Sequence, residues 1–207
     1  MLNKNLPAVN QALLGVVLNG GKSSRMGRDK STLVTPDGRL FLDLAMNRFN
    51  GVCRKHVLSI GSSGTTFRSD GAAFTVRDTH EARGPLGGIL SCINYASSHG
   101  FAACFFTPID MPFVAREHLL HLREKWLGSP HRVVCAFNPT RNSIEPLFSI
   151  IPVSFRRTIE ERIQSSRLSV EGWIKDQHPL CVSMDANALK NINNPTDYTR
   201  LLAASEC

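Results

Sequence analysis

Long apolar runs, paired cysteines and clusters of basic residues are all missing from this sequence of 207 residues. No apolar stretch approaches the roughly 20 residues of a membrane-spanning helix, so the sequence predicts no membrane association. The residues before Leu14 are polar and mixed, without the apolar core of a secretory signal. These absences predict a cytoplasmic protein in which residues 1–11 form a loose N-terminal extension.

The cysteines and histidines also lack the spacings of a metal or redox motif. None of the six cysteines belongs to a C-x-x-C pair, and the seven histidines complete no zinc pattern. Most of the cysteines lie in apolar segments such as Ala102–Phe106, where a free cysteine behaves as a small hydrophobic residue. This usage indicates a reducing compartment.

Basic residues outnumber acidic ones, giving a net charge of +7 and a pI of about 9.4. Such a balance attracts polyanions. The charges are scattered, however, with no long Lys/Arg run and no basic stripe interleaved with aromatic residues. The sequence therefore favours a small phosphorylated ligand over a nucleic acid.

Apolar segments of strand type alternate with segments of helical spacing. This alternation predicts one α/β domain over residues 1–207, with a mostly parallel sheet and helices on both faces. The predicted strands lie near 14–18, 55–61, 73–76, 102–107, 132–137, 144–151 and 180–182, and the predicted helices near 40–49, 84–97, 115–127, 154–165, 170–175 and from 194 onward. Ligands bind beyond the carboxyl ends of such strands, where the strand order reverses.

The loop that follows the first strand combines glycine with positive charge. Within residues 18–30 it has three glycines, two serines and four basic side chains. Glycine lets a backbone approach a ligand closely, and successive N–H groups with nearby Lys or Arg bind anions. The loop therefore predicts a polyphosphate site; the alternative is a surface loop that is basic by chance.

Neither common phosphate motif fits this loop. A Walker A motif requires glycine five residues before Gly21, where the chain has Val16. The glycines at 20, 21 and 27 also do not form G-x-G-x-x-G. Instead, L-N-G-G-K-S-S-R-M-G-R-D-K at 18–30 resembles L-x-G-G-x-S-x-R-M-G-x-D-K, the signature loop of the molybdenum cofactor guanylyltransferases. Asn19 departs from the alanine that this family usually has.

The resemblance implies a three-layer, Rossmann-like nucleotidyltransferase fold and a nucleotide site. In the loop it implies nucleotide contacts from Leu18, Asn19, Gly20, Gly21, Arg25 and Lys30. Arg25 would bind the outer phosphates, and Lys30 would lie near the α-phosphate. A fixed cation there would neutralise charge that grows in the transition state, so both residues are expected to be catalytic.

Asp110 directly follows a wholly apolar strand, which would lift its carboxylate to the rim of the sheet. One or two carboxylates together with substrate phosphates usually hold Mg²⁺. The alternative is an aspartate that caps the next helix. The family has a metal-binding aspartate in a D-x-P context, matched by Asp110-Met111-Pro112, so the resemblance implies a catalytic, nucleotide-binding and metal-binding role for Asp110.

Asn193 is the second expected metal ligand. Asn191–Asp197 resembles the family's N-x-N-[ST]-P-x-D segment, whose asparagine at the position of Asn193 helps to bind the metal in related nucleotidyltransferases. An amide oxygen can complete a Mg²⁺ shell without adding charge. For Asn194 the expected role is helix capping.

The base of the nucleotide is expected to lie near Gly84-Pro85-Leu86-Gly87-Gly88, which resembles the family's G-P-L-x-G segment. The resemblance implies contacts from Gly84, Pro85, Leu86 and Gly88, and it matches Asp78 to an aspartate that reads guanine. A carboxylate can accept both N1–H and N2–H of guanine. The alternative for Asp78 is a turn residue at the end of a strand.

Two further positions depart from the family. Its second strand often ends with asparagine near the nucleotide, whereas this chain has Ser59-Ile60-Gly61-Ser62. Before Pro146 the family usually has His or Gln, whereas this chain has Glu145, in the half expected to face the acceptor. The first departure bears on the choice of base and the second on the acceptor.

Together with these features, the resemblance implies Mg²⁺-dependent transfer of GMP from GTP to the terminal phosphate of molybdopterin or the molybdenum cofactor, with release of pyrophosphate. The alternatives are a transferase for CTP or another phosphorylated acceptor, and a nucleotide-binding partner protein without turnover. The expected protein partners are molybdenum-insertion proteins or target molybdoenzymes. We expect a monomer or weak oligomer.

Overall fold

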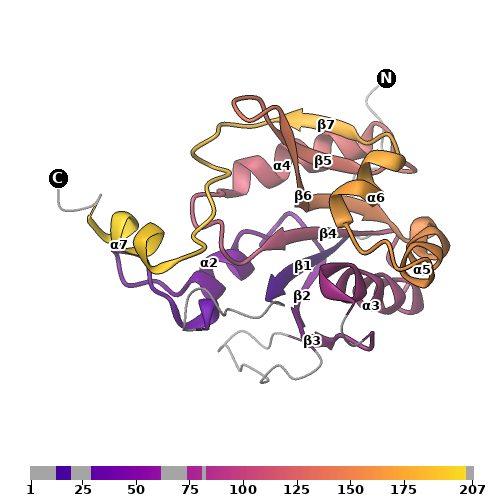
Figure 1. Ribbon diagram of the computed structural model, residues 1–207, viewed down its shortest axis with the longest axis horizontal. Helices are drawn as coiled ribbons and strands as arrows, with labels where there is room; N and C mark the ends of the chain where they lie inside the picture. Colours follow the sequence, from indigo (N-terminus) through magenta and orange to yellow (C-terminus); the bar gives the residue numbers. More distant parts are fainter. Residues whose placement is uncertain (1–12, 20–28, 62–73, 81–82, 204–207) are drawn as a thin grey trace.

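The computed structural model describes residues 13–19, 29–61, 74–80 and 83–203 (Figure 1). Its seven strands form one sheet in the order β3-β2-β1-β4-β6-β5-β7. The strands are β1 (Leu13–Asn19), β2 (Lys55–Ile60), β3 (Phe74–Arg77), β4 (Ala103–Pro108), β5 (Val134–Asn138), β6 (Ser143–Pro152) and β7 (Leu180–Ser183). Each predicted strand is confirmed close to its expected bounds, while the expected extension at 1–11 lies outside the described residues.

The sheet is parallel except at one strand. β1 pairs in parallel with β2 and β4, whereas β6 runs antiparallel between β4 and β5. Leu13, Leu14, Val16 and Val17 of β1 are fully buried. Burial on both faces of a central strand explains why β1 is a continuous apolar run without alternating polar residues.

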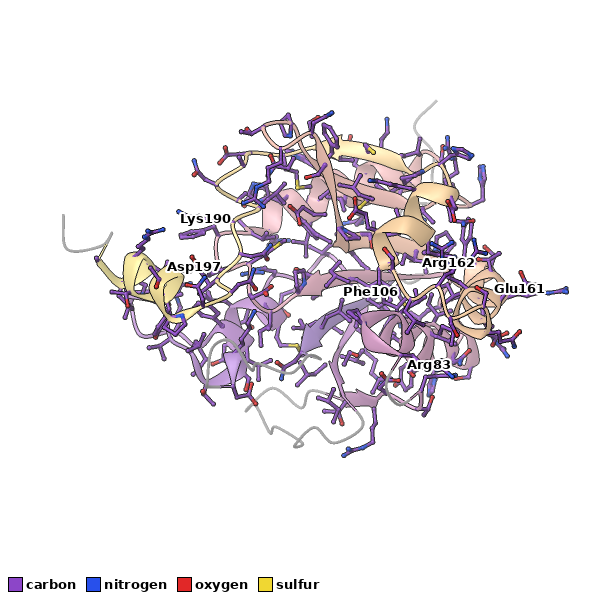
Figure 2. The ribbon with its side chains drawn as sticks, in the orientation of Figure 1. Arg83, Phe106, Glu161, Arg162, Lys190 and Asp197 are labelled. Atoms are coloured by element: carbon purple, nitrogen blue, oxygen red, sulfur yellow. The ribbon has the colours of Figure 1, made fainter. Side chains whose placement is uncertain are left out.

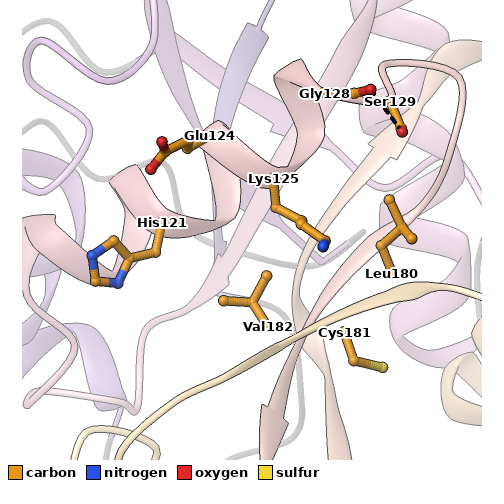
Figure 3. Close-up of a pocket in the computed structure, with 8 residues that line it drawn as sticks. All are labelled: His121, Glu124, Lys125, Gly128, Ser129, Leu180, Cys181 and Val182. Carbon is orange, nitrogen blue, oxygen red and sulfur yellow. Dashed lines mark hydrogen bonds between the residues drawn. The ribbon is translucent and has the colours of Figure 1, made fainter.

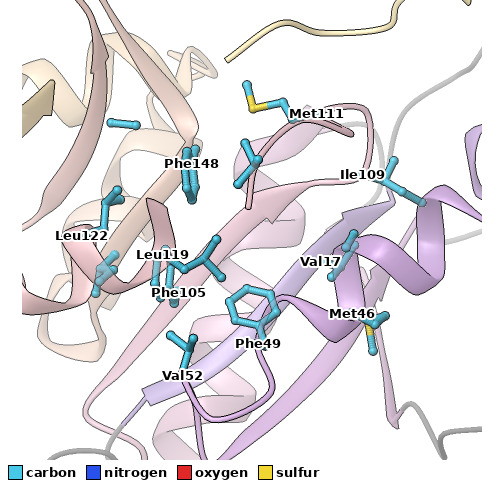
Figure 4. Packing of buried hydrophobic residues seen from close by; sticks show 14 of the residues in the cluster. Val17, Met46, Phe49, Val52, Phe105, Ile109, Met111, Leu119, Leu122 and Phe148 are labelled. Atoms are coloured by element: carbon cyan, nitrogen blue, oxygen red, sulfur yellow. The ribbon is translucent and has the colours of Figure 1, made fainter. Parts of the chain in front are cut away.

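Helices cover both faces of the sheet. One apolar cluster packs α2 (Phe41–Asn47) and α4 (Arg116–Leu127) against the sheet, and its aromatic centre includes Phe49 and Phe105, with ring centroids 5.6 Å apart (Figure 4). A second cluster packs α3 (Gly84–Ser98), α5 (Arg156–Gln164) and α6 (Val170–Asp176) against the other face. The predicted three-layer, Rossmann-like fold is confirmed.

Charged side chains lie outside these layers. In Figure 2, Glu161 and Lys190 project from the surface, whereas Phe106 lies between the sheet and its covering helices. Arg48 is an exception: it is only 6% exposed, and neither of its Nη atoms has a hydrogen-bond partner. Burial lowers the pKa of Arg48 to about 10. Among the described helices, none has the length and apolar character needed to cross a membrane.

The strand order reverses between β1 and β4. The chain runs outward from β1 through β2 to β3, and β4 then pairs with the opposite side of β1. At the carboxyl ends of these strands, Leu18 lies opposite Pro108, and the Ile109 N–H donates to the Leu18 carbonyl at 3.3 Å. Such a reversal of strand order is where open α/β sheets bind ligands.

Candidate functional site

Three residues expected to act together meet at this edge. The Lys30 Nζ donates to Asp110 Oδ2 at 2.6 Å and to Asn193 Oδ1 at 2.9 Å. The Lys30 and Asp110 side chains are 16% and 18% exposed, so the ion pair is mostly shielded from water. The contact joins segments that are 80 and 163 residues apart in the sequence.

Local hydrogen bonds fix the backbone around Lys30. Lys30 begins the short 3-10 helix η1 (Lys30–Thr32), and Asp29 precedes it. Asp29 Oδ1 accepts from the Ser31 N–H at 2.9 Å and from the Ser31 hydroxyl at 2.8 Å. Because Asp favours this capping position, the turn presents Lys30 towards the sheet edge rather than continuing as a loop.

Asp110 does not cap a helix. Helix α4 begins after Ala115, so the alternative role for Asp110 as its cap is wrong. The Asp110 carbonyl accepts the Ile192 N–H at 2.9 Å, which brings the C-terminal segment next to the end of β4. Its carboxylate is thereby left to face Lys30.

Asn193 and Asn194 have different roles at the start of α7 (Pro195–Ala203). Asn194 Oδ1 accepts the Asp197 N–H at 2.9 Å, which confirms its predicted capping role. Asp197 Oδ2 in turn accepts the Asn193 N–H at 3.1 Å. This reciprocal cap fixes the Asn193 backbone and leaves its amide oxygen for Lys30.

Tyr198 fastens α7 to the chain that follows Lys30. Its hydroxyl donates to the Val34 carbonyl at 2.9 Å and accepts the Val34 N–H at 3.3 Å. Its ring packs edge-on against Phe41, with centroids 6.2 Å apart. Figure 1 shows α7 beside α2 accordingly. This connection, the Tyr198–Val34 clasp, links the segments that carry Lys30 and Asn193.

The oxygens at this site fit a hard divalent cation. Asp110 contributes a carboxylate and Asn193 an amide oxygen, the ligand types that Mg²⁺ prefers. Within the part of the chain that the structure describes, no group of three His, Cys, Asp or Glu residues could hold a metal. A metal here would therefore have few protein ligands, as is usual where substrate phosphates complete the shell.

Asp78 lies in a turn after β3. Its Oδ1 accepts the His80 N–H at 2.8 Å and the Ser91 hydroxyl at 3.3 Å, so the alternative of a strand-end turn residue holds for this oxygen. Its Oδ2 faces α3: a Cβ on Gly87 would lie 3.1 Å from it and 2.9 Å from the His80 carbonyl. A side chain at position 87 would crowd this carboxylate, so Gly87 and Ser91 position Asp78, although neither was predicted as a site residue.

The remaining residues expected to contact the nucleotide divide into exposed and buried ones. Gly84, with φ of +60°, and Pro85 are exposed at the start of α3, whereas Leu86 is fully buried and Leu18 is 9% exposed in the same apolar cluster. Leu86 and Leu18 can therefore offer a ligand only backbone groups. Gly88 is buried beside Ser59.

Of the loop at 18–30, the structure describes both ends, residues 18–19 and 29–30. Asn19 closes β1 opposite Ile60 and is half-buried. Gly20, Gly21 and Arg25 lie outside the described residues.

Glu145 adds a second carboxylate to the Asp110 side of the sheet. It lies at the start of β6, opposite Ala136 and next to an irregularity in the β5–β6 pairing. Burial raises the pKa of Glu145, the Asp110 and Glu171 carboxylates raise it further, and Arg141 opposes them. Glu145 and Asp110 are thus close enough for the Asp110 carboxylate to oppose the ionisation of Glu145.

A surface cleft of about 600 Å³ lies elsewhere, between α4 and β7 (Figure 3). Its lining includes His121, Lys125, Cys181 and Val182. Strands β6 and β5 separate β7 from β4 in the sheet. The cleft is therefore distinct from the Lys30–Asp110–Asn193 cluster.

Comparison with known proteins shows the family of the chain. A family model described as MobA-like NTP transferase domain matches residues 15–183. The chain belongs to this family. It is 34% identical over 188 residues to a probable molybdenum cofactor guanylyltransferase of Rhodopirellula baltica, covering 89% of each chain. The predicted membership of the molybdenum cofactor guanylyltransferases is thereby confirmed, and the protein is a nucleotidyltransferase.

Solved structures support the fold. Molybdopterin-guanine dinucleotide biosynthesis protein A from Archaeoglobus fulgidus superposes with a TM-score of 0.69 at 19% identity, covering 93% of this chain and 98% of the other. The 2-C-methyl-D-erythritol 4-phosphate cytidylyltransferase from Thermus thermophilus gives 0.68 at 12% identity with the same coverage. At these identities the likeness concerns the fold alone.

Removing the Tyr198 hydroxyl tests how much the Tyr198–Val34 clasp contributes to stability. Tyr198→Phe loses two hydrogen bonds to Val34, so the free energy of unfolding should fall by about 1–2 kcal/mol. Hydrogen exchange at residues 193–198 should become faster. The matched control is Tyr95→Phe, because the other tyrosine of the chain bonds Lys55. Equal exchange at 193–198 in both variants would contradict a local role of the clasp.

Glu145 predicts a pH-dependent effect on stability. Because its pKa is raised above the ordinary value of 4.5, the ionised form costs the folded state stability above the raised pKa, and the cost disappears as pH falls towards 4.5. Glu145→Gln should therefore increase stability at pH 7–8, with the difference shrinking towards pH 4.5. Urea denaturation of metal-free protein at several pH values measures this, with exposed Glu124→Gln as control. A difference that grows towards low pH would contradict it.

Proposed function

We propose that the protein transfers GMP from GTP to the terminal phosphate of molybdopterin or the molybdenum cofactor and releases pyrophosphate, with Mg²⁺ as cofactor. The observation that carries this proposal is the meeting of Lys30, Asp110 and Asn193 at the reversal of strand order. The name of the Rhodopirellula relative supports the choice of guanylyl transfer and of this acceptor.

In this proposal the phosphates of GTP lie across the loop at 18–30. Lys30 lies near the α-phosphate, Arg25 binds the outer phosphates, and Gly20 and Gly21 offer backbone N–H groups. An acceptor phosphate oxygen forms a bond to the α-phosphorus while the bond from that phosphorus to the bridging oxygen breaks, and pyrophosphate leaves. The attacking phosphate is already an anion at neutral pH, so the reaction needs no general base.

Asp110 and Asn193 would hold the Mg²⁺. The bound ion would supply neutralisation of phosphate charge, the main catalytic contribution in phosphoryl transfer. Positioning is the other contribution of the protein, and here the Tyr198–Val34 clasp and the Asp197 cap hold the two segments in place. The acceptor would enter on the Glu145 side, beyond Asp110.

The base would lie at the start of α3, over Gly84–Gly88. Asp78 Oδ1 already accepts two hydrogen bonds, so Oδ2 is the oxygen available to the N1–H and N2–H of guanine. Asn19 and the Ser59–Gly61 ending of β2 depart from the family, so CTP is the second candidate nucleotide.

The proposal treats residues 1–207 as one nucleotidyltransferase domain. We expect it to act in the cytoplasm as a monomer or weak oligomer. Its product would pass to molybdenum-insertion proteins or target molybdoenzymes.

Turnover tests the reaction. Pure protein is mixed with GTP or CTP, Mg²⁺ and molybdopterin, and pyrophosphate release is followed. Asp110→Asn should reduce kcat by about 100-fold or more because it removes the charged metal ligand. Exposed Asp185→Asn is the control and should be fully active. No pyrophosphate with either nucleotide, together with nucleotide binding that Asp110→Asn leaves unchanged, would favour a binding protein without turnover.

Base selection depends on Asp78 in this proposal. Asp78→Asn can keep the acceptor for the His80 N–H while replacing the free oxygen by an amide, which cannot accept from guanine. The ratio of kcat/KM for GTP to that for CTP should fall by about 10- to 100-fold. Asp78→Ala should lower the same ratio and also loosen the turn. A ratio unchanged in both variants would assign base selection to other residues.

A further inference from the structure

The Lys30 ammonium lies where the proposed metal would have to bind. Its Nζ is 2.6 Å from Asp110 Oδ2 and 2.9 Å from Asn193 Oδ1, the two oxygens assigned to Mg²⁺. Mg²⁺ binds oxygen at about 2.0–2.1 Å, so an ammonium between the same two oxygens leaves no room for it. In this arrangement Lys30 therefore competes with the metal for both oxygens.

We propose that Lys30 is an internal counter-ion of the metal site. When a nucleotide binds, the Lys30 ammonium leaves Asp110 and Asn193 and pairs with the phosphates of the nucleotide. The inference rests on the proposed function, because it takes Asp110 and Asn193 as the metal ligands. It adds that the free protein excludes divalent metal from those ligands, so that metal and nucleotide bind together rather than one after the other.

The contacts of Lys30 permit this exchange. Among the described residues, Asp110 and Asn193 are the only hydrogen-bond partners of its side chain, so its release breaks no other contact. The backbone stays fixed by the Asp29–Ser31 turn, while the four-carbon stem can swing the ammonium. Phosphate oxygens replace the carboxylate as partner, so the charge of Lys30 stays paired.

The surroundings of Asp110 also explain why its carboxylate needs a counter-ion. Asp110 is only 18% exposed and has Glu145 nearby, so a carboxylate without a cation would be costly. Lys30 supplies that cation until the metal does. Because nucleotide and metal both favour the state in which Lys30 has left, each should increase the affinity for the other.

If Lys30 competes with the metal, removing this lysine should increase the affinity of the protein for a divalent metal. Without nucleotide, Lys30→Met should bind Mn²⁺ about 10-fold or more tightly than the unsubstituted protein, since a positive charge within 3 Å of both ligands is gone. Lys30→Gln should also increase the affinity for Mn²⁺, while keeping a polar side chain at this position. Electron paramagnetic resonance of free Mn²⁺ during titration measures the affinity without any turnover.

Lys190→Met is the matched control. Lys190 is exposed and only three residues before Asn193, so this variant also removes one positive charge near the site but leaves the contacts of Lys30 with Asp110 and Asn193 in place (Figure 2). Its Mn²⁺ affinity should stay within about two-fold of that of the unsubstituted protein. The double variant Lys30→Met with Asp110→Asn should lose the gain, which would locate the bound ion at Asp110.

Mn²⁺ affinity that is equal or weaker in both Lys30 variants, with folding confirmed by circular dichroism, would overturn the inference. The proposed function fails by a different result, the absence of pyrophosphate release from the unsubstituted protein with nucleotide and acceptor. Turnover by the unsubstituted protein together with unimproved Mn²⁺ binding in the Lys30 variants would keep the proposed function and reject the counter-ion.

Discussion

The contact of one ammonium group with two oxygens organises this protein. Lys30, Asp110 and Asn193 come from the two ends and the middle of the chain. Their side chains meet because Asp110 follows β4 beside β1 and because the Ile192 N–H donates to the Asp110 carbonyl, which brings Asn193 to the same place. A shielded carboxylate needs a positive partner, so the fold around it must keep Lys30 within reach. The Asp29 turn, the Asp197 cap and the Tyr198–Val34 clasp serve this requirement on the two segments that carry Lys30 and Asn193.

The parts of this arrangement that are local in sequence could be predicted. Fully buried strands read as apolar runs, and Asp110 could be placed at a sheet edge because it follows such a run directly. Parallel strand order then implied that residues after different strands converge. Asn193 could be predicted only through the family motif, because its meeting with Lys30 depends on a contact across 163 residues.

What could not be predicted depends on packing between distant segments. Gly87 and Ser91 matter because α3 approaches the turn after β3, and no local pattern reports that distance. In the sequence, Tyr198 cannot be told from any other apolar residue of a helix, because its role depends on the hydrogen bonds of its hydroxyl with the distant Val34. For Asp78, the structure confirms the turn role for Oδ1, and the contact of Oδ2 with guanine stays a prediction.

The reversed direction of β6 gives the two halves of the edge different freedom to evolve. On the β1–β4 side, the chain that follows β4 is packed into the core, because Ile109 and Met111 are buried. Because β6 runs backwards, the β5–β6 hairpin around residues 138–143 also reaches this edge, and it is a surface turn. Surface hairpins tolerate insertion and exchange far better than core strands do. A change in this one short loop would therefore alter its half of the edge and leave the contacts of Lys30 as they are.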